Sequence, residues 1–377
     1  MRNNVSVSNG RLAVIYLARQ AEGIDPLNRF VRSYQSHEAG APHDLVVLYK
    51  GYQPTPKFDQ ARAVFAGLPH QAIEIDDNGF DIDAYFTAAR RINHSLVCFL
   101  NTYTAIAASG WLAALDRQAS KSHVGVAGAM GSFESVSSSS LFIQEIVQRC
   151  LSPSYKGNAT TNYYFDFVLS GRGGQMPARG GSWPQSVRAA VRRRLIRVCK
   201  VVRAHLYTPR LSSAHSAQLS RFPSFPNPHI RSNGFMMSRE RFLETGFPAM
   251  SSKWDAYAFE SGSDGLTARL RRQGWATVVV DRTGQGYDVD AWCQSGMFRI
   301  GTQRNLLLSD NQTRMFAGLA PGHQATVERM TWGDYLGPAP ADFPGLGFSF
   351  ARDPSAIAPR LAVSASCDKL VSDLRVA

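Results

Sequence analysis

Short apolar runs alternate with segments of helical periodicity over the first 130 or so residues. The run at 12–18 (LAVIYLA) is continuous and short, which is typical of a strand buried on both faces of a sheet. The next segment repeats apolar residues at helical spacing from Leu27 to Tyr34 and stops at Gly40. Further strands are expected at 45–49, 72–75, 96–100 and 124–128, with helices at 58–67, 82–92 and 111–118. This alternation predicts an α/β fold: an open, mainly parallel twisted sheet with helices on both faces.

The pattern changes after Gly131 and resumes near residue 223. Residues 171–184 are rich in glycine and proline, and 187–204 carries apolar residues at helical spacing with arginine and lysine on the other faces. We therefore expect a basic helical insertion. The predicted units are 1–134, the insertion 135–222, a second core segment 223–316 and a covering tail 317–377. In the second segment, strands are expected at 232–237 and 276–281 and helices at 239–244 and 264–273.

Composition narrows the class of protein. The chain has 377 residues, 44% of them hydrophobic, and no apolar run near the ~20 residues needed to cross a bilayer. Its five cysteines are scattered without a CxxC pair, so neither a disulfide framework nor a zinc site is expected. Residues 1–10 are polar and resemble no secretory signal, which favours a cytoplasmic location. The formal charge of +12 favours an anionic partner, either nucleic acid, a phospholipid surface or a phosphorylated substrate.

Polar side chains cluster after the third and fourth predicted strands. Asp76, Asp77, Asn78 and Asp81 follow the third strand, in a turn that contains Gly79. The carboxyl ends of parallel strands are where such sheets bind ligands, and carboxylates there can accept hydrogen bonds from a nucleotide base or ribose. The alternative is purely local, because a carboxylate from Asp81 or Asp83 can also cap the next helix.

The same segment resembles a known family. Asn78-Gly79-Phe80 before a helix, then an apolar strand ending in Asn101-Thr102-Tyr103, is similar to the NxG turn and DxD-type motif of GT-A glycosyltransferases, which include many inverting polysaccharide and O-antigen synthases. The resemblance covers roughly residues 10–130 and 227–285. It implies a nucleotide-sugar donor held by the 1–134 half and a glycan or lipid-linked acceptor held by 223–316. The donor-binding residues expected from it are Asp76, Asp77, Asn78, Asp81, Asn101, Tyr103 and Arg231.

The metal motif is where this sequence departs from the family. In typical members the DxD carboxylates hold a divalent ion, Mg²⁺ or Mn²⁺, that neutralises the donor diphosphate. Asn101, Thr102 and Tyr103 lack the anionic oxygens that these ions prefer, so no metal ligand is predicted among them, and the use of Mg²⁺ or Mn²⁺ stays an open alternative to a metal-independent reaction. The leaving diphosphate then needs other cations or hydrogen-bond donors, for which Arg231 is the first choice and His229 the second.

A carboxylate is also expected for proton transfer. Glu260 and Asp264 precede a segment ending in Arg272-Gln273-Gly274-Trp275, which is similar to the acidic motif that supplies the general base of inverting members. A base is needed because the acceptor hydroxyl loses its proton as it attacks the anomeric carbon. The alternative is a helix N-terminus that favours acidic groups. We favour Glu260 as the base, and expect His229, Asn233 and Trp254 at the acceptor.

The basic helix at 187–204 has three interpretations: docking on an anionic membrane surface, a solvated face, and nucleic-acid binding. Docking suits a lipid-linked acceptor and places the protein peripherally on the inner face of the plasma membrane. No nucleic-acid motif accompanies the helix, which makes nucleic acid the least favoured partner. For the whole chain, the alternative to an enzyme is a non-catalytic sugar- or nucleotide-binding protein on the same fold.

Overall fold

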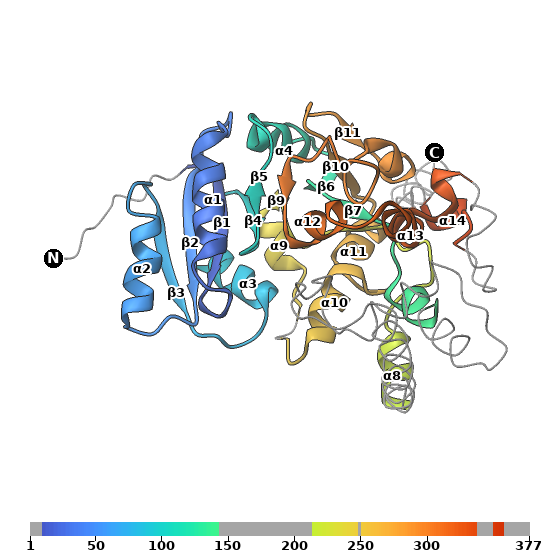
Figure 1. Cartoon of the computed structure of the whole chain (residues 1–377), viewed down its shortest axis with the longest axis horizontal. Coiled ribbons are helices and arrows are strands. Elements are labelled where there is room, and N and C mark those ends of the chain that lie inside the picture. The colour runs from blue at the N-terminus through green and yellow to red at the C-terminus, as the bar shows by residue number, and fades with distance from the viewer. Residues whose placement is uncertain (1–9, 143–212, 248–249, 338–349, 358–377) are drawn as a thin grey trace, which may run out of the picture.

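The computed structural model describes residues 10–142, 213–247, 250–337 and 350–357 (Figure 1). Its centre is an eight-stranded sheet in the order β11-β10-β6-β9-β4-β1-β2-β3. The strands are β1 (Leu12–Arg19), β2 (Asp44–Lys50), β3 (Gln71–Ile75), β4 (Leu96–Leu100), β6 (Val124–Gly128), β9 (Phe235–Ser238), β10 (Ala276–Val280) and β11 (Gly286–Tyr287). The neighbours among β1, β2, β3 and β4 are parallel, as are β6 and β10, whereas β9 runs antiparallel between β4 and β6. The predicted α/β fold with a mainly parallel sheet is confirmed.

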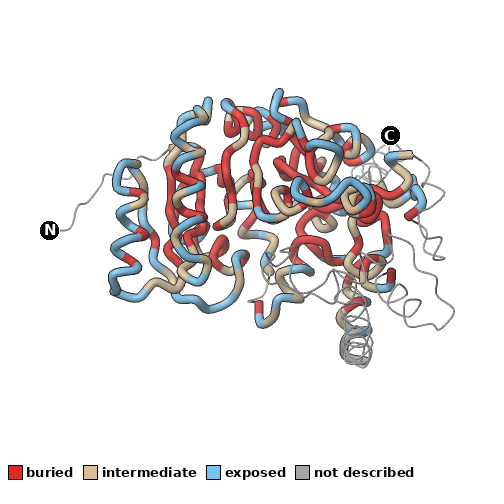
Figure 2. Tube along the Cα trace, in the orientation of Figure 1, coloured by how far each residue is buried: buried red, intermediate tan, exposed pale blue. Residues whose placement is uncertain are grey.

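Helices cover both faces of this sheet, because alternate residues of each strand point to opposite sides. Ala13, Ile15 and Leu17 of β1 pack in one core with α3 (Asp81–Arg91), α9 (Arg239–Glu244), α10 (Lys253–Ser261) and α11 (Leu266–Arg272). Val14 and Tyr16 pack in the other with α1 (Asp25–Ser36), α2 (Pro56–Val64) and α4 (Trp111–Ala119). The strands are mostly buried, whereas the outer surfaces of α1 and α2 are exposed (Figure 2).

The shorter elements connect and cover this core. They are η1 (Gln20–Glu22), β5 (Ala105–Ile106), β7 (Gly131–Ser132), α8 (Ser213–Leu219), β8 (His229–Ile230), η3 (Val289–Ser295), β12 (Leu308–Ser309), α12 (Asn311–Ala317), α13 (Pro321–Trp332), η4 (Gly333–Leu336) and α14 (Pro354–Ile357). Within the described ranges, no helix combines the length and the apolar composition that a membrane span requires.

Two of the helices were not expected from the sequence. The segment at 253–261 forms α10, which was not expected, and the Ser252 and Asp255 capping box at its start is the signal that could have revealed it. Residues 321–332, predicted as part of an irregular covering tail, form the helix α13 with a proline in its first turn. The predicted basic helix at 187–204 and the hinge at 171–184 lie outside the described residues.

Candidate functional site

The carboxyl edge of the sheet brings together residues that are far apart in the sequence. Because β9 is antiparallel to β4, the residues that lead into β9 lie beside the end of β4. The backbone N–H of Asn101 donates to the side chain of Asn233 at 2.9 Å, and Thr104 donates to the same oxygen at 2.7 Å. The side chain of Asn101 in turn accepts from the backbone N–H of Tyr103 at 2.9 Å. The two asparagines, predicted to face the donor and the acceptor, thus also hold this turn in place.

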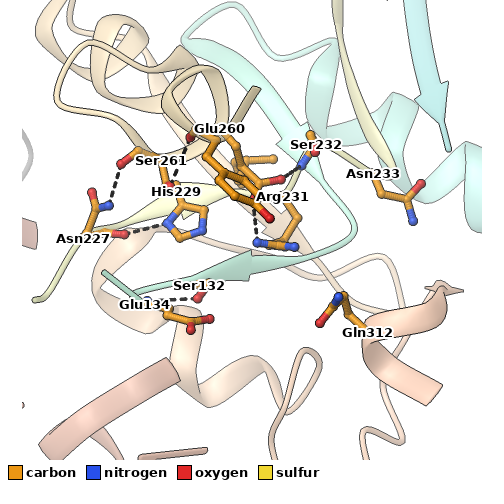
Figure 3. Close-up of polar contacts among 12 residues, drawn as sticks. Ser132, Glu134, Asn227, His229, Arg231, Ser232, Asn233, Glu260, Ser261 and Gln312 are labelled. Carbon is orange, nitrogen blue, oxygen red and sulfur yellow. Dashed lines mark hydrogen bonds and ion pairs between the residues drawn. The ribbon is translucent and has the colours of Figure 1, made fainter. Parts of the chain in front are cut away.

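A buried carboxylate stands at the same edge. Glu260 lies in the last turn of α10 and is 8% exposed. One of its oxygens forms an ion pair with Arg231, and the other accepts from the backbone N–H of Ser232 at 2.7 Å (Figure 3). The predicted cation and the predicted base, 29 residues apart, are therefore in direct contact.

The electrostatics of this pair keep both groups charged. Burial raises the pKa of the Glu260 carboxyl, but Arg231 and the hydrogen bonds from Ser232 outweigh burial and lower it. Burial lowers the pKa of Arg231, and the carboxylates of Glu260, Asp310 and Glu134 together outweigh that effect and raise it. Arg231 is 22% exposed, and among the described residues its Nε and Nη2 groups have no hydrogen-bond acceptor. These N–H groups are open to an anionic ligand.

His229 is held as a neutral imidazole. It is 3% exposed, and its Nδ1 lies 2.8 Å from the carbonyl oxygen of Asn227, so Nδ1 carries a proton and donates (Figure 3). Burial lowers the pKa of His229, although the Glu260 carboxylate opposes this. At neutral pH His229 therefore differs from the second cation that we expected, and it offers a hydrogen-bonding ring rather than a charge.

The polar residues after β1, β2 and β3 form a second, more open group. Arg19 Nε donates to Asp77 at 3.1 Å, and the buried Lys50 Nζ donates to the carbonyl oxygen of Gly79 at 2.7 Å. Burial lowers the pKa of Lys50, and Asp81 and Asp77 oppose this. Tyr103 donates to Glu22 beside the same group. Four of the residues predicted to bind the donor are exposed here: Asp76, Asp77, Asn78 and Asp81.

The cap of α3 comes from Asp83. Its side chain accepts from the backbone N–H of Phe80 at 2.8 Å and from that of Met250 at 3.0 Å. Gly79 adopts a positive φ of 67°, as the turn requires. Because Asp83 does the capping, the carboxylate of Asp81 is not needed for it.

Asp264 and Trp254 lie in different surroundings from Glu260. The Asp264 carboxylate is 63% exposed and pairs with Arg269 and Arg272, of which the hydrogen bond from Arg269 contributes most to lowering its pKa. Asp264 lines a cavity of about 350 Å³ together with Phe247 and other residues, and Glu260 does not line this cavity. Trp254, on α10, packs edge to face against Tyr257 with ring centroids 6.1 Å apart.

Three residues near Arg231 were not predicted. Arg299 donates to Glu134 at 2.7 Å and to Gln312 at 2.8 Å, and the last two lie below Arg231 in Figure 3. No periodicity or motif marks Arg299, since it lies in the irregular segment between η3 and β12. Glu134 does follow the carboxyl end of β6, and that position was the available signal.

The residues at the DxD position do not fit a divalent ion. The side-chain oxygen of Asn101 already accepts from Tyr103 and lies 3.2 Å from the Thr104 hydroxyl, and neither Thr102 nor Tyr103 is anionic. Across the described part of the chain, no group of three His, Cys, Asp or Glu side chains is placed to hold a metal. We therefore derive no chemical step through a metal.

No family model matches the chain, and no curated protein is similar to it in sequence. It is similar in part to solved structures. One is the mannosyltransferase PcManGT from Pyrobaculum calidifontis in complex with GDP-Man and Mn²⁺, with 14% identity over 33% of this chain and 36% of that one and a TM-score of 0.28. Another is residues 1–349 of S. aureus TarS, with 13% identity over 31% of this chain and 34% of that one and a TM-score of 0.24. A third is GalNAc-T7 with UDP, GalNAc and Mn²⁺, with 19% identity over 31% of this chain and 22% of that one and a TM-score of 0.25. The match spans little more than a third of these chains at most, and it carries no inference about function.

Proposed function

We propose that the chain is a glycosyltransferase that moves a sugar from a nucleotide diphosphate donor to a hydroxyl group of a glycan or lipid-linked acceptor, with inversion at the anomeric carbon. The observation that carries this proposal is the buried, ionised Glu260 in contact with Arg231, whose remaining N–H groups are open, at the carboxyl edge of a mainly parallel sheet. A base beside a cation is what sugar transfer to a hydroxyl needs.

The reaction balances with these two groups. The acceptor oxygen forms a bond to the anomeric carbon while its proton passes to the Glu260 carboxylate. The bond from the anomeric carbon to the diphosphate oxygen breaks, and the leaving diphosphate takes the electron pair. Charge-assisted hydrogen bonds from Arg231 stabilise the negative charge that develops there. A single displacement of this kind inverts the configuration.

We assign the remaining predicted residues by their surroundings. The exposed oxygens of Asp76, Asp77, Asn78 and Asp81 are suited to accept hydrogen bonds from the ribose and the base, and Asn101 and Tyr103 are assigned to the same donor. His229, Asn233 and Trp254 are assigned to the acceptor side. Asp264 was predicted as a second candidate for the base, and its two arginine partners make it the weaker choice.

The proposal extends to the setting of the reaction. The 1–134 half would hold the donor and the 223–316 half the acceptor, without a divalent ion. A lipid-linked acceptor would be met at an anionic membrane surface on the cytoplasmic side, with the 187–204 segment as the contact.

The test is a thermal-shift screen of the full chain against UDP-, GDP-, CMP- and dTDP-sugars, with Mn²⁺ or EDTA, because a ligand that binds the native state raises the midpoint by mass action. We expect one class of nucleotide sugar to raise the midpoint in EDTA. The nucleotide sugar that binds is then assayed for consumption with glycan acceptors, in the wild type and in Glu260→Gln. Glu240→Gln is the control, because Glu240 is exposed at the start of α9, at the opposite edge of the sheet.

Each outcome is informative. A shift that requires Mn²⁺ contradicts the metal-independent site. Binding without consumption of the donor favours the non-catalytic sugar- or nucleotide-binding protein. No shift with any nucleotide sugar contradicts the proposed function.

A further inference from the structure

We propose that Arg231 and Arg299 form a two-guanidinium clamp for a diphosphate group, with Glu134 as a carboxylate that occupies the clamp when no diphosphate is bound. This inference rests on the proposed function, since it names the groups that would hold the leaving group of that reaction. It adds Arg299 and Glu134, which neither the sequence nor the resemblance assigns.

The two arginines each lie close to the same aromatic ring. The guanidinium carbon of Arg231 lies 5.2 Å from the centroid of the Phe298 ring, and that of Arg299 lies 4.9 Å from the same centroid. The two cations therefore lie within about 10 Å of each other, each in cation–π range of the ring. Bringing like charges this close is unfavourable unless anions compensate, and two carboxylates do so: Glu260 at Arg231 and Glu134 at Arg299.

Arg299 combines an unusual backbone conformation with an unpaired donor. Its backbone has φ of 52°, in a region that residues other than glycine rarely adopt. Its side chain is 11% exposed, and its Nε is buried without a hydrogen-bond partner. Buried unpaired donors are uncommon, and a bound anion is one way to complete their bonding. A diphosphate, with more oxygens than a carboxylate, has the acceptors to do this.

The two carboxylates differ in how easily they can be displaced. Glu260 is fixed at both oxygens, by Arg231 and by the backbone of Ser232. The Glu134 side chain is 26% exposed, and within the described ranges its carboxylate contacts Arg299 and the Ser139 hydroxyl, the latter 3.5 Å away. An incoming diphosphate can therefore displace the carboxylate of Glu134 into water while Gln312, which is neutral, stays on Arg299. The diphosphate would then be bound by Arg231 and Arg299, with Glu260 as the one carboxylate that remains paired.

Two substitutions that break the same ion pair give opposite predictions. Arg299→Gln removes a cation of the clamp, so affinity for a diphosphate falls. Glu134→Gln removes the competing anion, so affinity rises. If the pair served only to hold the loop, both variants would destabilise the chain and neither would improve binding. The sign of the difference therefore separates a binding role from a structural one.

The experiment measures binding of inorganic pyrophosphate to the full chain by calorimetry at fixed ionic strength. We expect Arg299→Gln to weaken binding by about tenfold or more and Glu134→Gln to strengthen it several-fold, as expected for charge-assisted hydrogen bonds to phosphate. Arg11→Gln is the matched control, since Arg11 also pairs with a carboxylate but is 53% exposed and precedes β1 at the opposite edge. Unchanged affinity in Arg299→Gln, or weaker binding in Glu134→Gln, overturns the proposal.

Further ligands identify the source of the diphosphate and distinguish failure of the clamp from failure of the proposed function. UDP and GDP represent a nucleotide donor and farnesyl diphosphate a lipid-linked acceptor, and the ligand that shows the same pattern of variant effects as pyrophosphate identifies the source. If a nucleotide sugar is consumed and pyrophosphate does not bind, the clamp is wrong and the proposed function stands. If pyrophosphate binds with the expected signs and no nucleotide sugar is consumed, the clamp stands and the proposed function is wrong. Should Arg299→Gln fail to fold, Glu134→Gln still decides, because it leaves Arg299 and Gln312 in place.

Discussion

Two polar groups lie at the carboxyl edge of one sheet and differ in their exposure to water. In the group after β1 to β3, the paired side chains of Arg19 and Asp77 are 33% and 45% exposed. In the group formed by α10 and the segment between β8 and β9, the side chains of Arg231 and Glu260 are 22% and 9% exposed. An exposed ion pair contributes about 0–1 kcal/mol to stability, whereas removing one partner of a buried pair costs about 3–5 kcal/mol. The comparison suggests recognition by the first group and chemistry by the second.

The largest expected effect is on catalysis. Glu260→Gln keeps the shape of the side chain and removes the base, so turnover of the donor identified by thermal shift should fall by about 10²- to 10⁴-fold. Binding of the donor should remain, because the contacts of the first group are unchanged. Asp264→Asn, assayed in parallel, should keep most of the turnover, since Asp264 is exposed and paired with two arginines. Full activity in Glu260→Gln would mean that the base has been misassigned.

The next effect is on stability. Arg231→Met leaves the Glu260 carboxylate buried without its cation and should lower the free energy of unfolding by about 3–5 kcal/mol. Adding Glu260→Gln to that variant removes the buried charge and should restore much of the loss. The measurement is chemical denaturation of the single and double variants as a cycle. Additive effects of the two substitutions would show that the pair is not coupled, and the contrast between the two groups would disappear.

The sheet and part of the site could be predicted for different physical reasons. Buried parallel strands appear in the sequence as continuous apolar runs, and every strand expected between residues 12 and 128 is present. Arg231 and Glu260 were identified because each lies beside a local motif. The contact between Arg299 and Glu134 joins residues 165 apart and depends on how the loop after η3 packs, for which no local pattern exists.

Short helices with charged ends were the other limit. In α10, Lys253, Asp255 and Glu260 interrupt the apolar pattern over nine residues, so periodicity gave no signal. The sequence motif therefore placed Glu260 ahead of a helix, whereas in the structure Glu260 lies in the last turn of α10. Its orientation toward Arg231 depends on that helix, and the stability of the helix is thus open to test.

Asp255 provides this test with a moderate effect. Its carboxylate accepts from the backbone N–H groups of Ser251 and Ser252 and from Arg221. Asp255→Ala should destabilise the chain by about 1–2 kcal/mol, as loss of a helix cap does. Burial alone would raise the pKa of Asp255, but hydrogen bonds, that from the Ser252 side chain first, lower it to about 2. Its contribution is therefore complete above about pH 4 and lost as pH falls toward 2, and denaturation at pH 7 and pH 2.5 should show the difference shrinking.

A smaller effect comes from His229. Burial lowers the pKa of His229 below the ordinary value of 6.5. Just below pH 6.5 the imidazole is therefore protonated in the unfolded chain and neutral in the native state. The stability contributed by a neutral His229 is complete above pH 6.5 and is lost as pH falls through the folded pKa. One proton corresponds to at most about 1.4 kcal/mol per pH unit. Between pH 6.5 and 5, His229→Gln should therefore show a shallower decrease in unfolding free energy than the wild type, and equal slopes would contradict a buried neutral imidazole.

The smallest effect on stability is expected in the exposed group, where it is the most informative. Asp77→Asn breaks the pair with Arg19 and the longer, 4.0 Å contact with Lys50 Nζ. Because Arg19 and Asp77 are well exposed and Lys50 keeps its hydrogen bond to Gly79, the free energy of unfolding should change by less than about 1 kcal/mol. If this group binds the donor, the same variant should weaken nucleotide-sugar binding several-fold, measured as a smaller ligand-induced rise of the thermal midpoint. Asp116→Asn, which breaks the pair with Arg11 at the opposite edge, should leave that rise unchanged. A variant that loses binding while keeping its stability would show that the open group recognises the ligand. A loss of stability above 2 kcal/mol would instead place Asp77 in the framework of the fold, and the division between recognition and chemistry would have to be drawn elsewhere on this edge.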